Sequence, residues 1–255
     1  MNLRHILLDG AYNFRDLGGY PTLDKTYTAW GVFYRSDSLA KLSKKDWDIL
    51  EKRRVKTIID LRSKSEVESA PINMPKDIEY HNVSLMKDLD DTDSFSQFVL
   101  NKIDAKIVTS MILDYPSTVF GNLEGFAKVL KLLLDSIKRG STVFICSAGK
   151  DRTGMVSSLI LYFSNVLKED IVVDYMVSNT YNTHGVNKEI SSIPKEFINI
   201  VENLEALKDM YNSDPETILR LLKAFDEKDI SKLLEEKGFT KKDQENLKTL
   251  FTKPI

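Results

Sequence analysis

One cysteine and one arginine are spaced so that together they could bind and attack an anion. Cys146 is the only cysteine of the chain, and it opens the segment 146–154, CSAGKDRTG, directly after the apolar stretch Thr142 to Ile145. This order predicts a buried strand, a tight loop and a helix. The backbone N–H groups of such a loop turn inward, and the helix N-terminus adds a partial positive charge. We therefore expect the loop to bind phosphate.

The side chains of the loop suggest what it does with a bound phosphate. The same N–H groups favour the thiolate form of Cys146, which makes this residue a nucleophile rather than an inert core cysteine. Arg152, six residues later, can hold two phosphate oxygens side by side. The Thr153 hydroxyl could donate to the Cys146 sulfur and stabilise the thiolate. The expected phosphate-binding residues of the segment are Ser147, Ala148, Gly149, Lys150 and Thr153.

The Cys-x5-Arg-Thr pattern resembles the active-site loop of the protein tyrosine phosphatase superfamily. The fuller CxxGKDRTG form is similar to a bacterial branch that acts on phosphotyrosine and often on phosphoinositides. The other segments that resemble this branch span nearly the whole chain: Asn13–Tyr20, Phe33–Asp37, Ile58–Ser63 with Glu66, Asp174-Tyr175, Ser178-Asn179 and Gly238–Thr240. The chain departs from the superfamily at Ile145, where a histidine usually precedes the cysteine.

The resemblance implies a fold and a reaction. We expect an α/β fold of the protein tyrosine phosphatase type, similar to the dual-specificity enzymes, with a central sheet flanked by helices. Residues 1–255 would form one phosphatase domain with a lid-like insertion around 85–116 and a helical C-terminal region over 185–255. The implied reaction is hydrolysis of phosphate monoesters through a cysteinyl-phosphate, without metal or cofactor. The expected partners are phosphotyrosine proteins, with phosphoserine, phosphothreonine and phosphoinositides as further substrates.

The reaction needs a general acid, for which the sequence offers several aspartates. In the branch with Lys-Asp-Arg inside the loop, the loop aspartate is the favoured acid, which here is Asp151. Asp60 is the second candidate because it ends a strand beside the loop, although it could instead pair with Arg62 or Arg15. The acidic run of the insertion supplies further candidates: Asp88, Asp90, Asp91 and Asp93.

Three other charged residues have two interpretations each. Arg15 and Asp16, in the N-terminal motif, could contact substrate or tie down their own loop. Lys150 could be an ordinary solvated lysine or a second cation at the mouth of the pocket. In the second case it would favour polyanionic head groups such as those of phosphoinositides.

The elements that position these residues follow from periodicity and caps. Ser43 caps one predicted helix, Gly140 stops another, and the helical C-terminal third breaks near Asn212–Pro215. The predicted strands are Val32–Arg35, Val55–Leu61, Ile78–Ser84 and Thr142–Cys146, and the main helices between them are Leu123–Ile137 and Arg152–Val166. In the insertion, Phe95, Phe98, Met111, Ile112 and Tyr115 would offer apolar surface toward a substrate.

Composition narrows the remaining classes. A net charge of −2 offers no basic field for nucleic acid, and no stretch approaches the roughly 20 apolar residues of a membrane span. One cysteine excludes an intramolecular disulfide, which is typical of the cytoplasm and also compatible with secretion by a bacterium. The three histidines are scattered, so we expect no metal site.

Two alternative functions stay open: a catalytically weak phosphotyrosine- or phospholipid-binding pseudophosphatase, and a sulfur-transfer or arsenate-reducing enzyme. The oligomeric state stays open as well.

Overall fold

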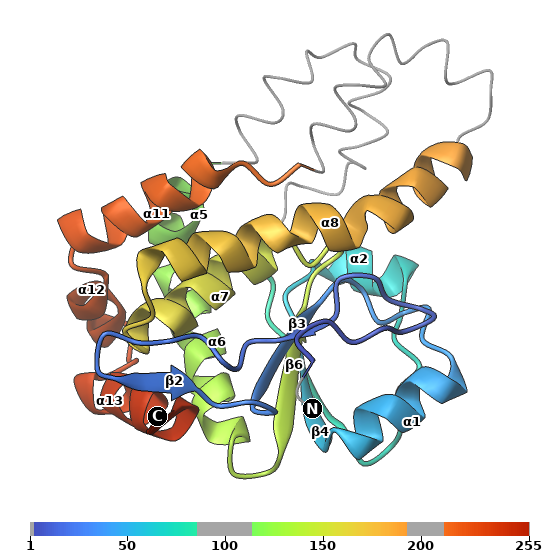
Figure 1. Cartoon of the computed structure of the whole chain (residues 1–255), viewed down its shortest axis with the longest axis horizontal. Helices are drawn as coiled ribbons and strands as arrows, with labels where there is room; N and C mark the ends of the chain where they lie inside the picture. The colour runs from blue at the N-terminus through green and yellow to red at the C-terminus, as the bar shows by residue number, and fades with distance from the viewer. Residues whose placement is uncertain (1–2, 86–113, 193–211, 255) are drawn as a thin grey trace, which may run out of the picture.

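A mixed five-stranded sheet forms the centre of the protein, which a computed structural model describes over residues 3–85, 114–192 and 212–254 (Figure 1). The strand order is β1-β3-β6-β4-β5, and β3, β6, β4 and β5 run parallel while β1 is antiparallel to β3. The strands are β1 (Arg15–Asp16), β3 (Phe33–Ser36), β4 (Val55–Asp60), β5 (Glu79–Asn82) and β6 (Ser141–Ile145). Together with the helices around it, this sheet confirms the predicted α/β class.

Helices cover both faces of the sheet. Helices α6 and α7 pack on one face, and α1 packs against β4 from the other side. The helices are α1 (Lys44–Lys52), α2 (Lys64–Ser69), α5 (Tyr115–Gly121), α6 (Leu123–Ser136), α7 (Asp151–Phe163), α8 (Lys168–Ser192), α11 (Pro215–Glu227), α12 (Ile230–Glu236) and α13 (Lys241–Phe251). The predicted cap at Ser43 is present and closes a capping box with Asp46. At the predicted break, Asp214 caps α11.

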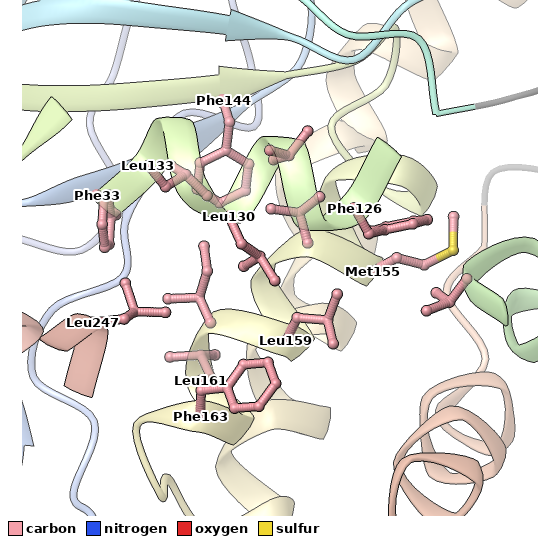
Figure 2. Packing of buried hydrophobic residues seen from close by; sticks show 14 of the residues in the cluster. Phe33, Phe126, Leu130, Leu133, Phe144, Met155, Leu159, Leu161, Phe163 and Leu247 are labelled. Carbon is pink, nitrogen blue, oxygen red and sulfur yellow. The ribbon is translucent and has the colours of Figure 1, made fainter. Parts of the chain in front are cut away.

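The two faces of the sheet belong to two apolar clusters, because successive side chains of a strand point to opposite sides. In β6, Phe144 joins the larger cluster with α6 and α7, whereas Val143 and Ile145 join the smaller cluster under α1. Figure 2 shows the larger cluster, where Phe144 and Phe126 lie among leucines of α6 and α7. Strand β6, which leads into the predicted loop, is therefore packed against apolar side chains on both of its faces.

The C-terminal part differs from the prediction at both ends. Its helical structure begins at Lys168 rather than at residue 185, because α8 is one continuous helix from Lys168 to Ser192. Its last residues are not helical: β7 (Thr252–Pro254) pairs antiparallel with β2 (Thr26–Thr28) in a separate two-stranded sheet. A three-residue strand has too little periodicity to stand out in sequence, and a distant partner decides it.

Most of the predicted insertion lies outside the described residues, as do residues 193–211 of the C-terminal region. Of the segment 85–116, the structure describes Leu85 and the start of α5 at Tyr115. The aspartates 88, 90, 91 and 93 and the apolar residues 95, 98, 111 and 112 therefore stay predictions. Among the described helices, none is long and apolar enough to cross a membrane.

A buried ion network joins α8 to the sheet. The carboxylate of Asp174 in α8 accepts from Arg15 Nε at 3.1 Å and from Arg35 Nη1 at 2.5 Å, and all three side chains are almost fully buried. Burial alone would raise the pKa of Asp174, but the charges of Arg15 and Arg35 outweigh it and hold this pKa at about 2. The network therefore depends on an ionised Asp174.

We predict that Asp174→Asn lowers the free energy of unfolding by about 3–5 kcal/mol, since it leaves two buried guanidinium groups without their counter-charge. Urea denaturation at neutral pH measures this loss. Because the pKa of Asp174 is about 2 in the folded protein and ~3.9 when unfolded, its contribution is complete above about pH 4 and disappears as the pH falls toward 2. The variant should lack this part of the acid sensitivity.

Glu227→Gln is the matched control for Asp174→Asn. It removes an exposed helical pair with Lys223, 3.5 Å apart, and should change stability by at most about 0.5 kcal/mol. A loss in Asp174→Asn no larger than in this control would contradict the importance of the network.

Candidate active site

The predicted loop lies where three parallel strands end. Cys146 directly follows β6, the strand between β3 and β4, and only 2% of the residue is exposed. Asp37 and Ser38 follow β3, and Arg62 follows β4 at the same edge. Residues 147–150 make the turn, and α7 begins at Asp151. This carboxyl edge is where open parallel sheets bind their ligands.

The carbonyl groups of the turn all point outward, into hydrogen bonds with the surrounding protein. The backbone N–H of Ser38 donates to the Ser147 carbonyl at 3.0 Å. The Asn13 amide donates to both Ala148 and Gly149, and Asn182 also donates to Ala148. Arg35 Nη2 donates to Gly149 at 2.7 Å and to Lys150 at 3.3 Å.

Fixing these carbonyls fixes the N–H groups, because the two ends of a peptide unit point in opposite directions. Within the described part of the chain, no protein acceptor is present for the backbone N–H groups of Ser147, Ala148, Gly149, Asp151 and Arg152. These N–H groups lie in the turn between Cys146 and the N-terminus of α7, and a loop of this kind at a helix N-terminus binds anions. An anion held there would lie against the thiol.

Gly149 is required by the geometry of this turn. Its φ is +63°, and a Cβ built on it would lie 2.4 Å from backbone atoms of Ser36 and Asp37. Any side chain would push the loop away from the end of β3.

Arg152 is held in place by Glu66. Its Nη1 lies 2.5 Å from Glu66 Oε2 and its Nη2 lies 2.8 Å from Oε1, while the Ser147 hydroxyl donates to the same carboxylate. Burial opposes ionisation of Glu66, but the hydrogen bonds and charge of Arg152 outweigh it and lower its pKa to about 2. Arg152 Nη2 also donates to the Ser147 hydroxyl oxygen at 3.2 Å, so three hydrogen bonds fix the guanidinium plane. The five N–H groups of a guanidinium leave further donors for a phosphate.

Glu66 is a site residue that the sequence analysis placed only within a motif. It is the N3 residue of α2 and closes a capping box with Ser63. The Ser-x-x-Glu spacing accounts for the cap, but it gives no hint that the same carboxylate also reaches Arg152.

Asp151 lies at the first turn of α7 with its side chain 29% exposed. Its Oδ1 accepts from the Tyr115 hydroxyl at 2.5 Å and lies 3.4 Å from Lys150 Nζ. Tyr115 is fully buried in α5, so the expectation that it offers apolar surface toward a substrate is wrong. Its ring is part of the core, and its hydroxyl contacts the candidate acid.

Asp60, the second candidate acid, is fully buried beside Arg62. Arg62 donates to it through Nε and Nη2, at 3.0 and 2.7 Å, and the Tyr80 hydroxyl donates at 2.9 Å. The alternative interpretation, an ion pair with Arg62, is therefore the arrangement in the structure.

The expectation that the side chains of Arg15, Asp16 and Lys150 contact substrate is wrong, whereas the other interpretation of Arg15 and Asp16, bonds that hold the N-terminal motif in place, agrees with the structure. Arg15 is fully buried and its guanidinium is directed to Asp174, while Asp16 accepts from the backbone N–H groups of Gly18 and Gly31, so neither lines the loop. Lys150 is not at a pocket mouth: its side chain is 2% exposed and its Nζ donates to the Asn212 carbonyl.

Thr153 and Ile145 complete the site. The Thr153 hydroxyl is buried and has no hydrogen-bond partner among the described residues, so the predicted bond to the Cys146 sulfur is not formed. Ile145, where the superfamily has histidine, packs in the smaller apolar cluster, whereas Cys146 belongs to the larger one. The side chain of Ile145, which replaces the usual histidine, therefore lies on the face of the sheet opposite to the Cys146 thiol.

Cys146 at the end of β6, a following turn whose carbonyls are bonded to the surrounding protein, and Arg152 oriented by Glu66 are together suited to a cysteine-based phosphate-binding site on an α/β sheet. The family comparison agrees: the chain belongs to the tyrosine phosphatase family, whose family model matches residues 6–253.

Several known proteins are similar to this chain. A tyrosine-protein phosphatase of Nostoc commune is 30% identical over 59% of this chain, and a triple specificity protein phosphatase, PtpB, of Mycobacterium tuberculosis is 28% identical over 68%. The matched regions span about half (49%) of the Nostoc protein and 68% of PtpB. Among solved structures, TpbA of P. aeruginosa is 13% identical with a TM-score of 0.34, covering 78% of this chain and 91% of its own. The Siw14 catalytic core is 14% identical with a TM-score of 0.38, covering 86% and 95%.

We predict that Gly149→Ala weakens the binding of inorganic phosphate by about ten-fold or more, measured by calorimetry, because a positive φ and a backbone clash together cost about 1–3 kcal/mol. Gly238→Ala is the control, since Gly238 also has a positive φ, +90°, but nothing lies within 4 Å of the position that a Cβ would take there. That variant should bind phosphate normally. Unchanged binding in Gly149→Ala would show that the loop does not hold the anion.

Proposed function

We propose that this protein is a protein tyrosine phosphatase that hydrolyses phosphate monoesters through a cysteinyl-phosphate. The main support is the arrangement of the loop: four consecutive outward carbonyls, N–H donors around Cys146, and Arg152 oriented by Glu66. Membership of the tyrosine phosphatase family supports the same reaction.

In the first step, the Cys146 sulfur attacks phosphorus in line with the leaving oxygen. The S–P bond forms as the P–O bond breaks, and the bonding electron pair stays with the leaving oxygen. Asp151 gives its proton to that oxygen, so that an alcohol or phenol departs. The loop N–H groups and Arg152 stabilise the charge on the three remaining oxygens.

In the second step, water attacks the phosphorus of the cysteinyl-phosphate. The Asp151 carboxylate accepts a proton from this water, the S–P bond breaks, and its electron pair returns to sulfur. Inorganic phosphate leaves and the thiolate is restored. The charges needed for both steps come from protein groups, so the proposed mechanism uses no metal.

Phosphotyrosine is the substrate that the proposal favours. The expectation of phosphoinositides had two grounds, the resemblance to the CxxGKDRTG branch and Lys150 as a second cation at the pocket mouth. A Lys150 buried against Asp151 does not supply that cation, so only the resemblance still supports phosphoinositides. The similar protein PtpB is named a triple specificity protein phosphatase. The appropriate test is therefore to measure kcat/KM on peptides that contain phosphotyrosine, phosphoserine or phosphothreonine and on phosphoinositides. Higher kcat/KM on phosphoinositides than on phosphotyrosine peptides would reverse the order proposed here.

We predict that Cys146→Ser abolishes turnover of p-nitrophenyl phosphate without added metal while phosphate binding remains, because the loop donors are unchanged. Arg152→Ala should impair both turnover and binding, since it removes the oriented guanidinium. Circular dichroism of both variants controls for folding. Substantial turnover in Cys146→Ser would exclude the covalent mechanism.

We also predict that Asp151→Asn lowers kcat/KM for a poor leaving group, such as phenyl phosphate, by about 10²–10⁴-fold, and much less for p-nitrophenyl phosphate. Asp60→Asn is the control: it should reduce stability, because Arg62 loses its charged partner, and leave the dependence on the leaving group unchanged. If Asp60→Asn alone shows the leaving-group effect, the acid role belongs to Asp60.

A further inference from the structure

Tyr115 and Tyr175 form a buried pair of hydroxyl groups behind Asp151. Their rings meet edge to face with centroids 5.9 Å apart, and their hydroxyl oxygens are 2.9 Å apart. Tyr115 is at the start of α5 and Tyr175 is in α8, so two helices outside the loop meet at its aspartate. The proposed reaction gives neither tyrosine a role.

The contacts of Asp151 distinguish its two carboxylate oxygens. The Tyr115 hydroxyl and Lys150 Nζ both contact Oδ1, whereas Oδ2 has no polar partner among the described residues. An oxygen that accepts a hydrogen bond from a hydroxyl cannot also present a proton along that line. When Asp151 is protonated, the proton therefore belongs on Oδ2, on the partly exposed side of the carboxyl group.

Tyr115 keeps its proton and donates it to the Asp151 carboxylate. Burial, followed by the negative charge of Asp151, raises its pKa well above the usual value for tyrosine. Since Tyr115 donates to Asp151, the hydrogen bond between the two tyrosines must run from Tyr175 to Tyr115. The two hydrogen bonds therefore run in one direction, with Tyr175 donating to Tyr115 and Tyr115 donating to Asp151 Oδ1.

We propose that Tyr115, supported by Tyr175, is a positioning residue that occupies Oδ1 of Asp151 and so directs the acidic proton, on Oδ2, toward the leaving group. This inference rests on the proposed role of Asp151 as general acid. Without the Tyr115 hydroxyl, either oxygen could carry the proton and the carboxyl group could rotate. The loss would then fall on substrates whose leaving group needs the proton.

The test is Tyr115→Phe, assayed as kcat/KM, which reports the step in which the leaving group departs. We expect roughly a ten-fold loss for phenyl phosphate, as for one hydrogen bond to a charged group, and less than about three-fold for p-nitrophenyl phosphate. The inhibition constant of inorganic phosphate should not change, because Tyr115 does not touch the loop N–H groups. Tyr175→Phe should give the same pattern with a smaller loss, and it serves as a second variant if Tyr115→Phe folds poorly.

Tyr162→Phe is the matched control. Tyr162 also donates to an aspartate, Asp226, at 2.8 Å, but it lies at the other end of α7, about 16 Å along the helix from Asp151. This variant should keep wild-type kcat/KM on both substrates.

A double variant shows whether Tyr115 acts through Asp151. In Asp151→Asn, adding Tyr115→Phe should cost nothing further on phenyl phosphate. Equal losses on both substrates, a weaker phosphate inhibition constant, or an additive loss in the double variant would each overturn the inference and leave the phosphatase proposal standing. If Asp151→Asn itself shows no leaving-group dependence, the acid assignment fails and the inference fails with it, whereas loss of turnover in Cys146→Ser still tests the phosphatase separately.

Discussion

The outward hydrogen bonding of the carbonyls of residues 147–150 is the constraint on which the site depends. Because the N–H groups of the same peptides can face a phosphate only while these carbonyls face away, the donors behind the loop decide whether the anion site exists. Those donors come from the N-terminal motif, from β3 and the segment after it, and from α8. In the proposed site, residues that do not contact the phosphate would thus determine its binding.

Paired charges make this arrangement rigid. Asp174 lies between two buried arginines, one of which, Arg35, also donates to the loop, and Glu66 fixes the plane of Arg152. A buried guanidinium without a partner would cost several kcal/mol, so each pair stabilises one geometry rather than a range of geometries. The arginine that would meet phosphate therefore arrives already oriented, and little side-chain entropy remains to be lost on binding.

The proposed nucleophile, Cys146, and the proposed acid, Asp151, are held in different ways for a physical reason. The loop N–H groups must all point at one anion, so the protein fixes every peptide of the turn. A general acid must give and later take a proton, so only one of its oxygens can be committed. Asp151 matches this need, because its contacts from Tyr115 and Lys150 meet on Oδ1.

The sequence alone determined the features that depend on neighbours in the chain: the strand, turn and helix around Cys146, the cap at Ser43, the break before Asp214, and the α/β alternation. The spacing of apolar residues and the local propensities for helix, strand and turn determine these elements, and both can be read from the sequence. Only the tertiary structure decided that Lys150 is buried, that Arg15 pairs with Asp174, that Glu66 holds Arg152, and that Tyr115 reaches Asp151. Apart from the placement of Lys150, these contacts join residues 36 to 159 positions apart in the chain. Which side chains meet across such separations depends on how the helices and strands pack together, and no local sequence pattern encodes this packing.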